Sequence, residues 1–159
     1  MSLLAPHRPG IPLPAPTAIS QPFWDGCSAG RLMYQRCGLC GRALFDPTPI
    51  CRWCGGFDLS WHQSEGVGAI YSWSVVWRPA GPEFACPYAA VIVDIDEGFQ
   101  ILANAVGCEP DALFVGQRVG VEFHPIGGGY SLPYFRPVSQ PETGKLTARN
   151  ASDEGVRHA

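Results

Sequence analysis

Four cysteines between residues 37 and 54 carry the clearest chemistry in the sequence. They form two CxxC pairs, Cys37 with Cys40 and Cys51 with Cys54, and a glycine follows each pair. Zn²⁺ binds four thiolates in a tetrahedron with Zn–S distances of about 2.3 Å, and each CxxC turn directs two sulfurs toward one point. The ten-residue spacing between the pairs therefore predicts a zinc ribbon that holds one structural zinc per chain.

A site closed by four thiolates leaves no coordination position for a substrate, so this metal predicts stability rather than catalysis. Three further cysteines, Cys27, Cys86 and Cys108, could act as nucleophiles only with a base and an orienting group. The histidines of the expected ordered body are His62 and His124, and the sequence pairs neither of them with a cysteine. A self-contained hydrolase or transferase that uses Cys86 or His124 is one hypothesis.

The elements that position these residues are expected to be short and mostly β. Nineteen glycines and 16 prolines leave few stretches with a helical period. A short helix at 22–31, which Pro22 suits as a first-turn residue, and a strand at 32–37 lead into the first cysteine pair. Apolar alternation then predicts five strands, at 66–77, 87–96, 99–106, 117–125 and 130–137. This pattern, with one long connection after the third strand, fits an OB-type barrel, and a small β-sandwich fits almost as well.

The chain divides into four expected regions. Residues 1–20 read as a flexible proline-rich arm, 21–63 as the helix and ribbon, 64–138 as the barrel, and 139–159 as a disordered polar tail. No apolar run reaches the roughly 18 residues that a membrane helix needs, and the N-terminus lacks the apolar core of a signal peptide. We therefore expect a cytoplasmic protein without a membrane partner, in a reducing compartment where paired cysteines favour metal.

Charge argues against a nucleic-acid partner, although zinc ribbons and OB folds often have one. The chain has a net charge of −3, and residues 64–138 hold three arginines against eight acidic residues, a net charge of −5. Binding to phosphates needs the opposite sign. A nucleic-acid-binding module therefore remains only a weak alternative.

Several motifs together resemble a known family. After the GLCGR and FDPTPIC knuckle segments come WHQSEGVGAIYSWSVVWRP, PYAAVIVDIDEG and the closing LPYFRP. In this order they resemble the zinc-ribbon plus OB-fold family of acyl-CoA-associated proteins, of the domain-of-unknown-function-35 type, over about residues 21–138. The resemblance implies a mostly β fold: a short N-terminal helix and a rubredoxin-like zinc ribbon, followed by a five-stranded OB-fold barrel.

The resemblance also implies a function. Members of this family are non-catalytic accessory subunits of thiolase-fold enzymes, which include lipid-transfer-type aldolases, thiolases and acyltransferases, or of MaoC-like enoyl-CoA hydratases. The partner performs the chemistry on a CoA thioester, in lipid or steroid degradation, and the small subunit helps to form the acyl-CoA channel. We therefore expect a protein partner of one of these kinds, an acyl-CoA shared with it, and no catalytic residue in this chain.

Candidate contact residues for that partner or for its ligand are aromatic residues and arginines near the ends of the barrel strands. They are Trp77, Arg78, Phe84, Tyr88, Tyr134, Phe135 and Arg136. Arginine binds phosphate through two hydrogen bonds and stacks on adenine, so Arg78 and Arg136, each beside an aromatic residue, are the candidates for the CoA phosphates. An ion pair with the partner at the interface is an equal alternative for both. Arg118, at a strand start, is expected to be a solvated strand residue.

Overall fold

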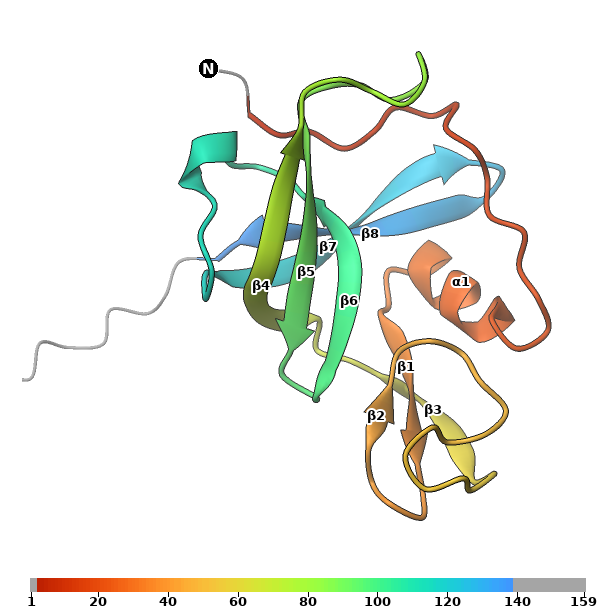
Figure 1. Cartoon of the computed structure of the whole chain (residues 1–159). Coiled ribbons are helices and arrows are strands. Elements are labelled where there is room, and N and C mark those ends of the chain that lie inside the picture. The colour runs from red at the N-terminus through yellow and green to blue at the C-terminus, as the bar shows by residue number, and fades with distance from the viewer. Residues whose placement is uncertain (1–2, 139–159) are drawn as a thin grey trace, which may run out of the picture.

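A computed structural model describes residues 3–138 of the chain. Figure 1 shows two parts: a five-stranded barrel, and a small three-stranded sheet beside helix α1. This is the expected mostly β fold with one short helix, and the barrel is closed, which excludes the β-sandwich alternative. No helix within the described residues is both long and apolar enough to cross a membrane.

Helix α1 (Gln21–Ser28) and the three-stranded sheet form the ribbon region. Pro22 lies in the first turn of α1, and Gly30, with a φ of 70°, ends the helical path. Strands β1 (Met33–Cys37), β2 (Ala43–Leu44) and β3 (Leu59–Gln63) pair antiparallel in the order β2-β1-β3. Because β1 is central and ends at Cys37, its pairing with both neighbours fixes the position of that cysteine.

The barrel contains five strands in the order β4-β5-β6-β8-β7. Their bounds are β4 Val67–Val76, β5 Tyr88–Ile95, β6 Phe99–Ala105, β7 Arg118–Gly127 and β8 Tyr130–Pro137, with the short 3₁₀ helix η1 (Pro110–Ala112) before β7. All neighbours are antiparallel except β6 and β8, which share only two parallel residue pairs. Each strand lies within a residue or two of its predicted position.

An aromatic stack joins the ribbon to the barrel. The ring of Phe99, on β6, stacks between Tyr34 of β1 and Phe45, with centroid distances of 5.0 and 5.6 Å. Phe99 belongs to the same buried cluster as Val91, Val93 and other inward residues of the barrel. The two parts therefore share one hydrophobic core, so the ribbon is not a separately hinged module.

The N-terminal arm differs from its sequence expectation. Instead of hanging free, residues 3–11 lie against the barrel: the Leu4 amide donates to the Cys108 carbonyl and the Leu4 carbonyl accepts from Gly107. Leu4, His7 and Ile11 are all buried. The prolines prevent regular structure, but they leave these side chains free to pack, so in Figure 1 the arm follows the barrel before it turns down to α1. The expected disordered tail, 139–159, lies outside the described residues.

Candidate metal centre and contact surface

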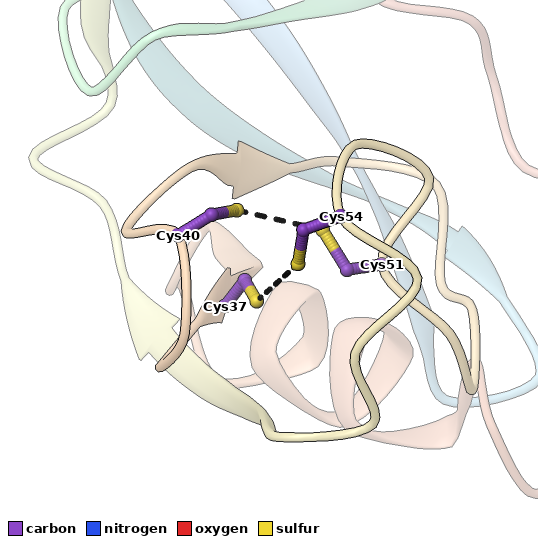
Figure 2. Close-up of side chains that lie close together, drawn as sticks. All are labelled: Cys37, Cys40, Cys51 and Cys54. Atoms are coloured by element: carbon purple, nitrogen blue, oxygen red, sulfur yellow. Dashed lines mark hydrogen bonds between the residues drawn. The ribbon is translucent and has the colours of Figure 1, made fainter.

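The four predicted cysteines come together in the structure. Figure 2 shows Cys37 and Cys40 on one turn facing Cys51 and Cys54 on the other. Their sulfur atoms all lie within 4.8 Å of one another. Cys37 and Cys51 are buried, whereas Cys40 and Cys54 are exposed at the tip.

The spacing of the sulfurs fits zinc. Two opposite edges of the cluster measure 3.6 Å, from Cys37 to Cys54, and 3.7 Å, from Cys40 to Cys51. A tetrahedron with Zn–S bonds of about 2.3 Å has edges of about 3.8 Å. Burial raises the thiol pKa of Cys51, but backbone N–H groups of Trp53 and Cys54 and neighbouring thiols outweigh it and bring the pKa down to about 7. These residues thus form a structural site for one zinc ion.

The glycine after each pair has the backbone that a knuckle requires. Gly41 and Gly55 have φ values of 73° and 72°, a region that other residues rarely adopt. The Gly41 amide donates to the Cys37 carbonyl, and the Gly55 amide donates to the Cys51 carbonyl. The two knuckles therefore have the same local geometry.

The predicted contact residues fall into two groups. Trp77 and Arg78 are exposed where β4 enters the β4–β5 loop, and within the described residues no ion pair involves Arg78. Tyr134 and Phe135 are only 1% and 0% exposed, so the expectation that they offer a surface to a partner is wrong. Phe84 and Tyr88 are half-buried because both rings pack against His7 of the arm.

Arg136 is engaged within the chain. Its Nε and Nη2 donate to the two carboxylate oxygens of Glu122, at 2.6 and 3.0 Å, and His124 Nε2 lies 2.6 Å from the same carboxylate. This bidentate pair lowers the pKa of Glu122, with burial opposing and His124 adding to the effect. Arg118 is paired in the same way with Asp96. Arg78 is therefore the better of the two predicted candidates for an external phosphate.

Two hollows lie where α1 and the ribbon meet the barrel. One, of about 370 Å³, lies between α1 and strands β5, β6 and β8; its walls are mainly apolar, and they include Phe23, Trp24, Leu102 and Leu132. The other, of about 590 Å³, separates the ribbon from the β5–β6 turn. The larger hollow is lined by charged residues: Asp94, and Arg52 paired with Asp46 at 2.9 Å. The smaller hollow, with its mainly apolar walls, is therefore the better site for an apolar group.

Comparison with known proteins identifies the family. The model of the ChsH2 rubredoxin-like zinc ribbon domain matches residues 24–60, and that of the ChsH2 C-terminal OB-fold domain matches residues 61–124. A DUF35 domain-containing scaffold protein of Pyrococcus furiosus is 34% identical over 112 residues, which cover 64% of this chain and 80% of that protein. The chain belongs to the DUF35 family.

Two further similarities of this DUF35 chain are to chains of enzymes. A solved chain described as "Ltp2-ChsH2(DUF35) aldolase" superposes with a TM-score of 0.73 at 32% identity, covering 79% of this chain and 98% of that one. A probable enoyl-CoA hydratase alpha subunit of Thermomonospora curvata is 34% identical over 121 residues, 76% of this chain. The matched region spans only 38% of the length of that hydratase subunit.

Sequence reasoning missed a buried polar cluster in this DUF35 chain. The Asn104 amide contacts His7 Nε2 at 3.2 Å, and the His7 amide donates to the Tyr134 hydroxyl at 3.2 Å. Burial lowers the pKa of His7 and raises that of Tyr134. Asn104 and Tyr134 also line the smaller hollow. No sequence signal links His7 to this cluster, because 97 residues separate it from Asn104.

Proposed function

We propose that the chain is a non-catalytic accessory subunit of a thiolase-fold acyl-CoA enzyme, such as a lipid-transfer-type aldolase, a thiolase or an acyltransferase. The likeness to the chain from the Ltp2-ChsH2(DUF35) aldolase carries this proposal, because it extends over nearly all of that chain. The description of the Pyrococcus furiosus relative as a scaffold protein supports the same role. We place the complex in the cytoplasm, where thiolate ligands stay reduced.

The side chains that could have performed chemistry are engaged in other ways. His124 contacts Glu122 rather than a thiol, and burial raises the pKa of Cys27 to about 12, which keeps it an unreactive thiol. Cys86 lies in the β4–β5 loop, and among the described residues no hydrogen bond joins it to a histidine. These arrangements support a division of labour in which the partner supplies the catalytic groups.

We further propose that the apolar hollow of about 370 Å³ is this subunit's part of the acyl-CoA channel. Its volume lies within the range of small-molecule sites. Phe23 and Trp24 of α1 form one wall, and Asn104 and Tyr134 lie on the barrel side. The Tyr134 hydroxyl already accepts a hydrogen bond from the His7 amide, and the Asn104 amide contacts the His7 ring. The hollow therefore suits an acyl group that is mostly apolar.

A MaoC-like enoyl-CoA hydratase is the second candidate partner. Two relatives favour it: the Thermomonospora curvata protein, and the 3-oxo-4,17-pregnadiene-20-carboxyl-CoA hydratase alpha subunit of Mycobacterium tuberculosis, which is 28% identical over 97 residues. A nucleic-acid partner remains disfavoured by the net charge of −5 over residues 64–138.

Co-expression tests the proposal directly. The tagged chain is produced with the untagged thiolase-like subunit encoded nearest to it and, separately, with the nearest hydratase-like subunit. We expect one of them to co-purify in a fixed ratio and to turn over an acyl-CoA only in the complex. A lone chain that binds neither subunit would contradict the proposal, as would turnover of an acyl-CoA by the chain alone.

Arg78 gives a sharper test of contact with the ligand. If its free guanidinium holds a CoA phosphate, Arg78→Ala should raise the KM of the complex for the CoA ester by about ten- to a hundredfold, with kcat little changed, because a charge-assisted hydrogen bond contributes roughly 1.5–3 kcal/mol. The matched control is Arg136→Ala, which removes the same charge but breaks the internal pair with Glu122. We expect the control to lower the melting temperature and to keep the KM. An unchanged KM in Arg78→Ala would mean that Arg78 does not hold the CoA phosphates.

A further inference from the structure

Strand β4 has an open edge over its second half. Its first residues pair with β7, from Val67 opposite Gly120 to Ala69 opposite Arg118. Ile70 is the last residue with partners on that side, since its amide donates to Gln117 and its carbonyl accepts from Gly116. From Ser72 to Val76, β4 pairs only with β5 among the described residues, and Tyr71 lies at a register shift without a partner in either ladder.

This edge exposes backbone groups as well as side chains. N–H and C=O groups alternate between the two sides of an antiparallel strand, so about half of those in residues 71–76 face away from β5. Four successive residues, 71–74, are exposed, and Tyr71 is 55% exposed. Phe114 and Val115, just before Gly116 meets Ile70, are exposed as well. The open edge is thus a strip of backbone with apolar side chains around it.

The strip has few of the usual protections of an edge strand. Proteins commonly guard such edges with lysine, other charges, proline, a bulge or a covering element. The segment YSWSVV contains no charge and no proline, and the one irregularity, a register shift between Ile70 and Ser72, lies at its start. The edge of β6 is different, because α1 and the ribbon lie beside it, with Phe45 stacked on Phe99 and Phe23 across the smaller hollow. The unpaired stretches of β4 and β6 are therefore not equivalent.

We propose that residues 71–76 of β4 accept an extended strand of the enzyme subunit, which continues the barrel sheet by one strand. Free N–H and C=O groups in a row are complementary to another peptide backbone, and an acyl chain or a phosphate cannot satisfy them in series. The added strand is uncharged at its centre, to match Tyr71 and Trp73. It carries lysine or arginine only at the end away from the exposed Arg78, because the barrel residues 64–138 have a net charge of −5. The same charge opposes the pairing of two copies of this chain edge to edge. This inference rests on the proposed accessory function.

Hydrogen exchange on the complex obtained by co-expression tests the inference. In the free chain, the amides of residues 71–76 that face the open edge should exchange faster than those bonded to β5. In the complex they should slow by about tenfold or more, because each gains a backbone acceptor. A complex in which these amides exchange as fast as before would overturn the inference and leave the accessory function standing.

Two other outcomes would also overturn it. If neither enzyme subunit binds, the accessory function and the added strand fail together. If the free chain is a dimer in which residues 71–76 are already protected, a second copy fills the edge instead.

A charged variant provides an independent readout. Ser74→Lys places a positive charge beside the open edge and should weaken the affinity for the enzyme subunit by about tenfold or more. Gln63→Lys is the matched control, since it adds the same charge to an exposed position of β3 on the ribbon and should leave the affinity within about twofold. Equal affinities for the two folded variants would overturn the inference, and melting curves show that both are folded.

Discussion

Replacement of Cys51 by serine is expected to release the metal and unfold the ribbon. Binding of a structural zinc by a small domain contributes on the order of 10–16 kcal/mol of folding free energy, and loss of one thiolate removes much of it. Cys51 is buried in the small core with Cys37 and Leu44, so the serine hydroxyl would be buried without a metal partner. The zinc content per chain checks the release of metal, and circular dichroism with a melting curve checks the unfolding.

Cys86→Ser is the control for this experiment. Cys86 lies outside the four-sulfur cluster, so this variant should keep one zinc per chain and its melting temperature. A folded wild-type chain with less than one zinc, or a Cys51→Ser variant of full stability, would contradict the assignment.

Phe99→Ala is expected to uncouple the ribbon from the barrel. Phe99 is buried and stacks between Tyr34 and Phe45, and removal of a buried phenyl ring costs about 3–5 kcal/mol. Because this ring joins the two parts, we expect the wild-type chain to unfold in one transition. The variant should unfold in two, with the ribbon region melting first. Calorimetry of the zinc-loaded chain measures both the loss of stability and the separation of the two transitions.

Leu102→Ala is the matched control on the same strand, since Leu102 is 72% exposed. It should change the stability by less than about 0.5 kcal/mol. One sharp transition in Phe99→Ala, at the wild-type temperature, would mean that the stack does not couple the two parts.

The ribbon and the barrel strands could be predicted because their sequence signals are local. Two CxxC turns with glycine after each specify a knuckle whatever surrounds them, and the alternation from 66 to 77 or from 117 to 125 needs no knowledge of the strand partners. Three glycines in a row at residues 127–129 mark the end of β7 and the turn into β8, and all three have positive φ. Closure into a barrel was less certain, because the strand count and the long connection fitted a small β-sandwich almost as well, and the structure decides for the barrel.

Long-range packing could not be predicted in the same way. Alternation allows only every second residue of a strand to face one core, yet adjacent Tyr134 and Phe135 are both buried. Phe135 belongs to the barrel core, whereas the hydroxyl of Tyr134 contacts His7 of the arm. The arm thus creates a second buried side that the sequence of β8 alone cannot reveal. The pairing of Arg136 with Glu122 likewise depends on how β7 lies against β8.

The short contact between β6 and β8 has a mechanical consequence. A closed barrel is a ring, and the two residue pairs at Asn104 and Ala105 complete this one, compared with eight pairs between β4 and β5. Because regions with few local contacts open most readily, we expect local opening of the barrel to begin between β6 and β8. Leu102 and Leu132 lie on opposite sides of this short contact, at the apolar hollow. A wall at the most compliant point of a closed barrel can shift, so the hollow can widen or narrow without any change in the zinc ribbon.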